Sequence, residues 1–473
     1  MKHFIRKEVI ALTVKKGVDT FSLQQQMSKV NDSSIIPLLE KVFDELSDEE
    51  ELITVDRLEI NLGIIHRDAL TREELEKEIA NRIAEQVRER FKSLHYTPAM
   101  QKQPIENGRA GVWIKFLKTG RLGWNITAMD TVFRRQVLES LSGDYIMVRQ
   151  LREIINSYPD VAKRIVYQHD EDFIIRLIGI ITATLQDDLL LYGKEVTKFF
   201  RWMKAQGHRW YSSIDDAGDP EIYFFTRALR VAAKGELNPG PAAITMETLR
   251  PELLRFDERK KIPEQMLSDF PLLKPLVEEI LEDAGRTAPE EMTATEMQMQ
   301  EDERIEEDGV FVELAGLVLL HPFLQQFFKR LDLVNEEGFI SDKKRLKALY
   351  LLYFLGTGET EAPEEKLVIP KLLCDFPAGK PVKRKFRLTK KEVDECTGML
   401  LALIALWSII GHTSIEGLRE SFLQRNGKIF QRNENIYIQV EAKPFDMLLD
   451  HLPWNLGIIK LPWKEELIRV EWR

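Results

Sequence analysis

Residues 132–158 have the sequence VFRRQVLESLSGDYIMVRQLREIINSY, and this stretch decides the fold class of the chain. Apolar side chains recur in it every three or four positions, and Gly143 with Asp144 interrupts the pattern once. The spacing predicts two amphipathic helices joined by a short turn. The same helical stripe returns in residues 172–185 and 196–206. Residues 101–284 are therefore expected to form an array of helices, without the fixed period of a regular solenoid.

The first hundred residues change periodicity, which predicts a small α/β unit with the order β-α-α-β-α. Apolar and polar residues alternate in residues 10–14 and 58–62, as they do in half-buried strands. Helical spacing appears between them, in residues 23–30 and 35–46, and again in residues 75–91. The two strands are expected to pair, and the last helix is expected to lie on a sheet or on a partner.

Two changes in composition predict the domain boundaries. Residues 96–111 contain prolines and glycines between periodic segments, which is typical of a connection. Residues 285–309 are acidic, rich in methionine and glutamine, and almost free of large aliphatic side chains, which indicates a flexible linker. The chain is thus expected to be mainly α and multidomain, with an α/β unit at 1–100, the helical middle region at 101–284, the linker at 285–309 and an α+β domain at 310–473.

The C-terminal domain mixes both periods. Helices are expected at residues 314–331, 343–355 and 391–410, and strands at 436–440, 458–461 and 467–472. Thr413 and Glu416 have the spacing of a capping box, which predicts the start of a further helix.

Composition excludes several classes of protein. Hydrophobic residues make up 44% and charged residues 30%, the balance of a chain that packs a core. The net charge of −10 is spread along the sequence without a dense basic block, which argues against nucleic acid as a partner. The longest apolar run, residues 397–411, is shorter than the roughly 18 to 20 residues that span a bilayer, so a buried helix is expected there. With two cysteines and no cleavable leader pattern, a reducing compartment is expected.

Motifs for chemistry are missing from the sequence. The eight histidines never occur at the spacings that place two ring nitrogens on one metal, and no phosphate-binding glycine loop or nucleophile elbow occurs. Neither a metal nor another cofactor is therefore expected. An enzyme remains as an alternative, a hydrolase whose residues are dispersed in sequence, with His208, Asp215, Cys374 and His412 as candidates.

The most informative local motif is LPW, which occurs twice near the C-terminal end. Pro453 precedes Trp454, Pro462 precedes Trp463, and Lys460 lies between the two motifs. Proline fixes φ and removes a backbone donor, so each motif is expected to form a rigid corner that aims its tryptophan. These corners, with Trp472, either belong to the core, which is favoured, or form a docking surface, because rigid tryptophans are frequent interface anchors.

Several segments together resemble the contractile injection system tape measure family. They are IRKEVIALTV at 5–14, ITVDRLEINLG at 53–63, FLKTGRLGW at 116–124, LAGLVLLHPFL at 314–324, LVIPKLLCDFP at 367–377, HTSIEGLRESFLQRNGK at 412–428 and LPWNLGIIKLPW at 452–463, followed by a VEW ending. The blocks run in order from the first expected strand to the last residues. The candidate interaction residues within the blocks are Phe116, Thr119, Gly120, Trp124, His321, Pro322, Phe323, Pro453, Trp454, Lys460, Pro462, Trp463 and Trp472.

The resemblance implies a non-enzymatic structural or assembly protein of a phage-tail-like particle, without a cofactor. Its partners would be inner tube, baseplate or cap subunits, with self-association as a further option, but no nucleic acid and no stable membrane insertion. It implies assembly in the bacterial cytoplasm, with retention inside the finished particle left open. The resemblance leaves two roles open, tube length control and initiation of tube or baseplate assembly. Length is the difficulty for a ruler, because residues 101–309 drawn as one helix would reach only roughly 300 Å and the segment reads as short helices. An assembly chaperone or a general helical adaptor is the alternative.

Overall fold

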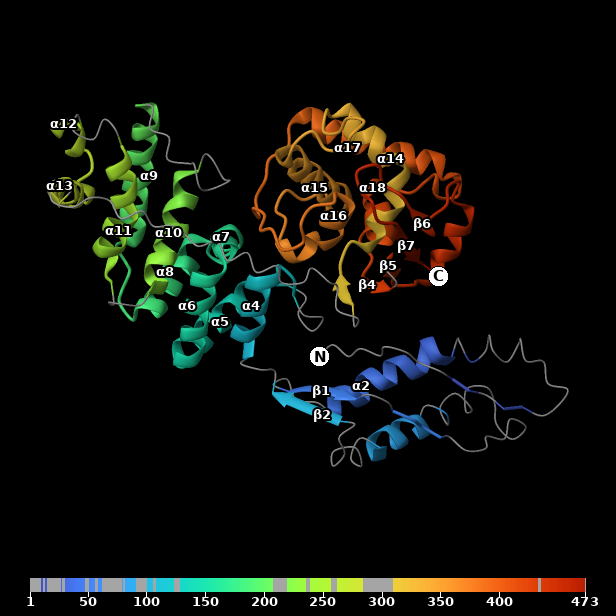
Figure 1. The fold of residues 1–473 in the computed structure, drawn as a ribbon. Coiled ribbons are helices and arrows are strands. Elements are labelled where there is room, and N and C mark those ends of the chain that lie inside the picture. Colours follow the sequence, from blue (N-terminus) through green and yellow to red (C-terminus); the bar gives the residue numbers. More distant parts are fainter. Residues whose placement is uncertain are drawn as a thin grey trace. The chain divides into compact units, whose positions relative to one another are not determined.

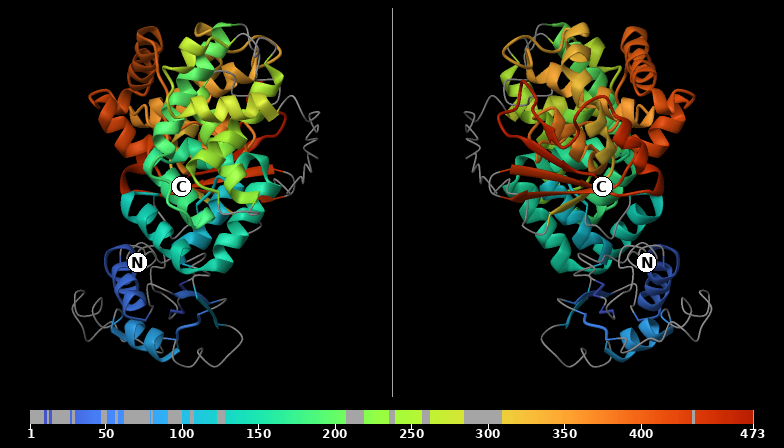
Figure 2. Two further views of the ribbon diagram at one scale, coloured as in Figure 1. Left: turned by 90° about the vertical axis from the view of Figure 1, so that its left-hand side faces the viewer. Right: turned by 90° about the vertical axis from the view of Figure 1, so that its right-hand side faces the viewer.

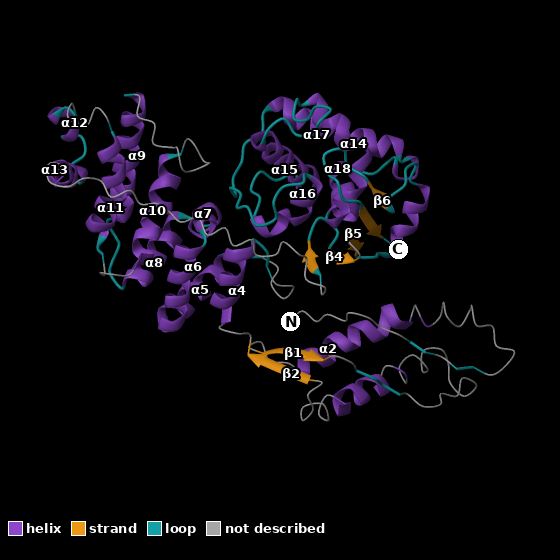
Figure 3. Cartoon of the chain, in the orientation of Figure 1, coloured by secondary structure: helices purple, strands orange, loops and turns teal. Residues whose placement is uncertain are grey.

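Helices make up most of the computed structural model, and one small sheet lies near its C-terminal end (Figures 1 and 3). The chain divides into two compact units, Met1–Gly108 and Arg109–Arg473. The described residues are 10, 11, 13, 14, 27, 30–46, 51–55, 58–61, 79, 81–90, 100–104, 108–122, 128–206, 219–234, 239–256, 262–283, 309–432 and 435–472.

The N-terminal unit has a small apolar core between two helical segments. A π-helical turn, η1 (Asn31–Ile35), continues directly into α2 (Ile36–Leu46), and residues 81–90 form the second helical segment. Val42 and Val87 are fully buried where these helices meet, and Arg88 forms an ion pair with Glu45 at 2.6 Å. Strands β1 (Glu51–Val55) and β2 (Met100–Pro104) pair antiparallel. The amphipathic helix expected in residues 75–91 is thus confirmed where it is described.

The expected strands of this unit are wrong in position. The described residues of 10–14 and of 58–62 are not in strands; instead Leu58 and Ile60 pack against the core of the unit as irregular chain. The strand that follows α2 lies earlier, at Glu51–Val55, and its partner β2 lies beyond the last expected helix. Two apolar side chains separated by one polar residue can also line one side of an irregular segment, so the alternation misled the assignment.

The second unit begins with what we call the helical lobe, residues 109–283. Its helices are short and follow one another through brief connections (Figure 1). They are α4 (Gly108–Thr119), α5 (Thr131–Gly143), α6 (Tyr145–Ser157), α7 (Pro159–Gln168), α8 (Glu171–Thr182), α9 (Leu189–Ala205), α10 (Pro220–Lys234), α11 (Pro241–Arg255), α12 (Glu264–Leu267) and α13 (Leu273–Asp283).

Aspartates start several of these helices. Asp130, Asp144 and Asp170 each precede a helix and accept hydrogen bonds from the backbone N–H groups of its first turn. The apolar faces of the helices pack together in one core, in which α10 contacts α6, α7, α8, α9 and α11. The helical array expected from the apolar periodicity is therefore confirmed.

The C-terminal lobe, residues 309–472, packs helices against a five-stranded sheet. Its helical elements are η4 (Ala315–Leu320), α14 (His321–Arg330), α15 (Asp342–Thr357), η5 (Glu364–Leu367), α16 (Val368–Leu373), α17 (Lys390–Leu406), η6 (Ser408–Ile410), α18 (Ile415–Leu418), η7 (Arg419–Leu423) and η8 (Pro444–His451). The turn η4 lies so close to η7 that a Cβ on Gly316 would lie 1.6 Å from the carbonyl oxygen of Phe422. Ser414, not Thr413, caps α18 by accepting from the Gly417 N–H, so the capping box expected from Thr413 and Glu416 is wrong, although a helix does start there.

The sheet has the order β3-β4-β5-β7-β6. Its strands are β3 (Val310–Val312), β4 (Gly427–Arg432), β5 (Asn435–Val440), β6 (Ile458–Ile459) and β7 (Ile468–Glu471). All neighbours are antiparallel except β5 and β7, which run parallel with Ile438 opposite Val470. The mainly helical fold class with a small C-terminal sheet is thereby confirmed. The expected linker at 285–309 lies outside the described residues except for Gly309.

The two lobes lie side by side, as the green helices and the orange and red elements do in Figure 1; Figure 2 views them along the direction that joins them. Each lobe has its own apolar core, and among the described residues the two cores have no member in common. No described helix is both long enough and apolar enough to cross a membrane.

Candidate functional site

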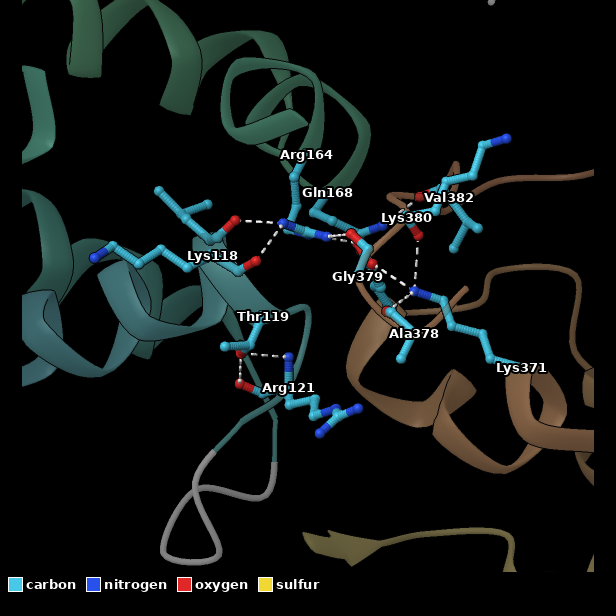
Figure 4. A network of polar contacts seen from close by, with 12 residues as sticks. Lys118, Thr119, Arg121, Arg164, Gln168, Lys371, Ala378, Gly379, Lys380 and Val382 are labelled. Atoms are coloured by element: carbon cyan, nitrogen blue, oxygen red, sulfur yellow. Dashed lines mark hydrogen bonds and ion pairs between the residues drawn. The ribbon is translucent and has the colours of Figure 1, made fainter. Parts of the chain in front are cut away.

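The place where the two lobes meet is the most unusual polar site of the described chain. Helix α7 of the helical lobe faces the loops around η5 and α16 of the C-terminal lobe, and Figure 4 shows the side chains between them. We call this set of contacts the junction. At its centre lie Arg164, Glu364 and Lys371, whose side chains are all at most 4% exposed. Charged side chains are rarely buried to this degree unless they are paired.

Arg164 joins the two lobes. Its Nε donates to Glu364 Oε2 at 3.1 Å, although the two residues are 200 positions apart in sequence. The rest of its guanidinium donates to backbone carbonyls, those of Leu117 and Lys118 in its own lobe and that of Gly379 in the other. Arginine suits this role because its planar guanidinium carries five donors in a fixed geometry.

Lys371 holds the other oxygen of the same carboxylate. Its Nζ donates to Glu364 Oε1 at 2.8 Å, and to the carbonyl oxygens of Ala378 at 2.9 Å and Lys380 at 2.8 Å. Burial lowers the pKa of the Lys371 ammonium, and the neighbouring Glu364 carboxylate opposes that shift. Two cations therefore share one anion, and the remaining positive charge is solvated by backbone carbonyls in place of water.

The end of α4 supplies part of that solvation. Leu117 and Lys118 lie in the last turn of the helix, where carbonyls lack a helical partner and the helix dipole is negative. Gly120 follows at φ +69, and a Cβ there would lie 2.7 Å from Glu364 Oε1. Glycine is required because its backbone is left-handed and the buried carboxylate lies against it.

Backbone groups join the lobes on the other side of α7. Gln168 donates from Nε2 to the carbonyl of Val382 at 2.7 Å and accepts at Oε1 from the Glu364 N–H at 3.1 Å. The N–H of Arg384 donates to the carbonyl of Tyr167 at 3.3 Å, and Lys383 lies over the Tyr167 ring. Since these contacts use both the amide of Gln168 and main-chain groups, they fix the register between the lobes.

A buried histidine lies next to the junction, at the end of α7. His169 accepts a hydrogen bond from Trp113 Nε1 at 3.0 Å and stacks on Phe173 with ring centroids 4.1 Å apart. Burial, with Arg134 and Arg384 nearby, lowers the pKa of His169 to about 3. The ring is therefore neutral at physiological pH.

Both oxygens of the Glu364 carboxylate are held by cations. Oε2 accepts from Arg164 Nε at 3.1 Å, Oε1 accepts from Lys371 Nζ at 2.8 Å, and Glu364 is fully buried. The arrangement can position two folded lobes against each other.

Two of the sequence blocks meet here. FLKTG forms the end of α4, where Phe116 is fully buried and the Thr119 hydroxyl donates to the carbonyl of Lys115. Gly120 is the residue whose backbone lies against the Glu364 carboxylate, as described above. Residues 367–377, LVIPKLLCDFP, provide Lys371. Trp124 lies outside the described residues.

Two of the predicted tryptophans are core residues. Trp463 is 9% exposed, packs against Phe328 and Phe339, and donates from Nε1 to the Leu373 carbonyl at 2.9 Å. Trp472 is 8% exposed and donates to Asp446 Oδ2 at 3.1 Å. The interpretation of these corners as core packing thus agrees with their burial.

The other predicted residues lie nearer the surface. Trp454 is half-buried against Phe323, with ring centroids 5.2 Å apart. His321 bonds the Val318 carbonyl through Nδ1 at 3.0 Å, and burial lowers its pKa. Three further members, Pro322, Pro453 and Pro462, are exposed, as is Lys460, whose ammonium donates to the carbonyl of Glu465. The structure gathers these residues in the C-terminal lobe, apart from the FLKTG block, which belongs to the helical lobe.

The residues of the enzyme alternative are not brought together where they are described. Cys374 is fully buried, and burial raises the pKa of its thiol well above the usual range, whereas His412 lies on an exposed turn. His208 and Asp215 lie outside the described residues. Within the described ranges no three His, Cys, Asp or Glu side chains are grouped as metal ligands.

Sequence reasoning missed Arg164 and Glu364, because each is an ordinary charged residue in its local segment. A signal existed for Arg164, since it lies among the buried positions of α7 with Val161, Ile165 and Gln168. Lys371 likewise interrupts an apolar run. A charge at a core position predicts a partner but does not identify it.

Comparison with protein families gives one match, and it covers almost the whole chain. The matching family model is described as contractile injection system tape measure protein, and it matches residues 2–472. Comparisons with curated proteins and with solved structures gave no match.

Proposed function

This chain belongs to the contractile injection system tape measure protein family, and from that premise we propose that it acts as a folded assembly component and not as an extended ruler. The family places it in a contractile particle, in a structural role connected with tail length. The finer proposal is that it binds tube, baseplate or cap subunits as a globular body and starts or guides their assembly, without catalysis.

The observation that carries the proposal is the Arg164–Glu364 ion pair. A ruler measures length by its contour, and 200 residues in one helix would extend roughly 300 Å. In this chain the two side chains are 3.1 Å apart, because the chain folds back on itself between them. A contour that is folded in this way does not serve as a measure of tube length.

Helix lengths support the same proposal. The longest helices among the described residues, α9 and α17, have 17 residues each, or about 25 Å. Their apolar faces are buried in the lobes to which they belong. A rod in a tube lumen needs a long uninterrupted helical or coiled-coil pattern instead.

The proposed contact surface is the exposed part of the LPW region. Pro453 and Pro462 are exposed, and Trp454 with Phe323 is half-buried beside them. Aromatic and proline side chains held rigidly at a surface are suited to protein contacts. The partners are the structural subunits of the particle, met in the bacterial cytoplasm during assembly.

Particle length tests the proposal. The gene would be deleted, then complemented with variants carrying 20 or 40 helix-forming residues between α9 and α10, and the particles imaged by electron microscopy. We expect no particles after deletion, and particles of unchanged length with either insertion. A ruler would lengthen the tube by about 1.5 Å per inserted residue, or about 60 Å for the longer insertion.

The same pair of insertions between residues 283 and 309 provides a second, independent site for the length measurement. An assembly component gives unchanged length at both places, whereas a ruler lengthens at both. Length that follows the insertions would overturn the proposal.

Two tryptophan variants test the contact surface. Trp454→Ala should impair assembly and leave the isolated protein folded, because that ring is only half-buried. Trp463→Ala should instead cost about 3 to 5 kcal/mol of stability, as is typical of a buried aromatic changed to alanine. Co-purification with tube or baseplate subunits and thermal unfolding would separate the two effects, and normal assembly by the Trp454 variant would remove this surface from the proposal.

A further inference from the structure

We infer that the junction is a latch: the helical lobe and the C-terminal lobe separate and reclose as intact bodies, without unfolding either one. The inference concerns the two states of the chain and holds whichever subunit the chain binds.

The interface between the two lobes is polar where its contacts are described. The apolar cores of the two lobes have no described member in common, and the partly buried side chains packed on each core come from the same lobe. Contacts across the junction are instead polar: Arg164, Gln168 and Tyr167 bond polar groups of residues 364–384. The N–H of Met129 donates to Glu365 Oε1 at 3.5 Å, and Asp219 pairs with Lys383 at 3.8 Å. When a polar interface opens, water can form the hydrogen bonds that are lost, so opening costs little free energy. When an apolar interface opens, the hydrophobic stabilisation is lost without replacement. Interfaces of this polar kind between domains are the ones that move.

The charge network around Glu364 can divide between the lobes. If the lobes part, Glu364 keeps Lys371 at 2.8 Å, and Lys371 keeps the carbonyls of Ala378 and Lys380. Arg164 keeps the carbonyls of Leu117 and Lys118 at the end of α4, in its own lobe. The buried Glu364 carboxylate is therefore not left without a cation, so opening avoids the large penalty of an unpaired buried charge. Asp219 loses its ion pair with Lys383 at 3.8 Å, but its side chain is 43% exposed and water can solvate it.

Two amides report directly on the latch. The N–H of Glu364 donates to Gln168 Oε1, and the N–H of Arg384 donates to the Tyr167 carbonyl, so both bonds cross the junction. Hydrogen exchange of the full chain, resolved to single residues by fragmentation mass spectrometry, compares them with amides inside α10 and α15. If the latch opens, the two junction amides exchange faster than the core amides of both lobes, because local opening needs less free energy than unfolding.

A variant sharpens the test. Arg164→Gln removes the cation that crosses the junction and leaves the Glu364–Lys371 pair in place. Exchange at the two junction amides should rise roughly 10- to 100-fold, the effect of losing a charge-assisted hydrogen bond, with core amides unchanged. Arg149→Gln is the control, since Arg149 lies on the exposed face of α6 and pairs only within that helix. Its exchange pattern should equal that of the wild type.

The opposite results overturn the latch. If the junction amides of the wild type exchange only together with the core amides, the two lobes unfold as one cooperative unit and the latch does not open by itself. The same conclusion follows if Arg164→Gln accelerates the whole helical lobe as much as the junction. Should that variant fail to fold, the wild-type comparison alone decides.

Discussion

Two buried arginines, one in each lobe, use the same chemistry for different purposes. Arg164 is 1% exposed and pairs with Glu364, a residue 200 positions away in the other lobe. Arg425 is 2% exposed and pairs at 2.5 Å with Asp446, only 21 positions away in its own lobe. Both arginines fill their remaining donors with backbone carbonyls.

The difference lies in what each pair loses when it breaks. Asp446 also accepts from Trp472 Nε1 and from the Lys443 N–H, so the Arg425 site ties β7 and η8 into one core. It cannot open without unfolding that lobe. Glu364 has a second cation beside it, and its site can divide along the lobe boundary. A buried ion pair can thus belong either to a fixed core or to a contact that opens. The outcome depends on whether the other partners of the two charged groups lie in the same lobe or in different lobes.

The largest expected effect breaks the fixed pair. Arg425→Met leaves the Asp446 carboxylate buried without a cation, which typically costs 3 to 5 kcal/mol. Chemical denaturation followed by tryptophan fluorescence should show the C-terminal lobe unfolding at lower denaturant than the helical lobe. Equal loss in both lobes would mean that the lobes unfold as one, and that the two arginines are not different in kind.

A smaller effect is expected at the junction itself. Gly120→Ala places a Cβ 2.7 Å from Glu364 Oε1 and forces alanine into a left-handed conformation, at about 2 to 3 kcal/mol. The penalty should fall on the docking of the lobes, so exchange at the Glu364 amide should rise while α9 and α15 remain protected. Gly143→Ala is the matched control, because nothing lies within 4 Å of its Cβ position. It should be neutral.

Acid should weaken the helical lobe through His169. The folded protein holds the pKa of this ring at about 3, whereas in the unfolded chain the ring takes up a proton below about 6.5. This contribution to stability is therefore complete above pH 6.5 and is lost as pH falls toward 3. Between pH 7 and pH 5.5 the loss should be about 1 kcal/mol.

Denaturation of His169→Gln at both pH values provides the control. Glutamine can accept the hydrogen bond from Trp113 Nε1 but does not titrate, so the difference between the two pH values should shrink by that amount. An unchanged difference would assign the acid sensitivity to other groups.

The smallest expected effect sets the baseline for the comparison. Arg149 and Glu153 form an exposed pair on α6, with side chains 71% and 62% accessible. Arg149→Ala should change stability by about 0.3 to 0.5 kcal/mol, as is usual for surface pairs. A loss near that of the Arg425 variant would show that removal of any arginine, buried or not, is costly here.

The sequence predicted the helices well, because the packing of a helix repeats within its own segment. The stripe of residues 148–158 became α6, with Leu151, Ile154 and Ile155 buried. Strand β5 and strand β7 also lie where apolar alternation placed them. The N-terminal strands failed because two or three alternating residues carry little information without knowledge of the partner strand.

The junction was largely beyond sequence reasoning. Gly120 and Lys371 fell inside blocks that were singled out, but nothing local connects them with Arg164 or Glu364. A contact over 200 residues depends on how two separately formed lobes meet, and no periodicity records that. The buried tryptophans were easier, since a large aromatic ring beside a proline is usually packed somewhere.

The order of strands in the C-terminal sheet has a consequence for the timing of synthesis. β3 opens the lobe at Val310 but pairs with β4 from Gly427, and β7, which contributes the central parallel pair, begins only at Ile468. At ribosomal rates of roughly 5 to 20 residues per second, β3 waits on the order of ten seconds for its neighbour to be made. The helical lobe has all its residues by then, so we expect it to fold before the sheet is complete. The contacts of the junction can form only once residues 364–384 have also been made.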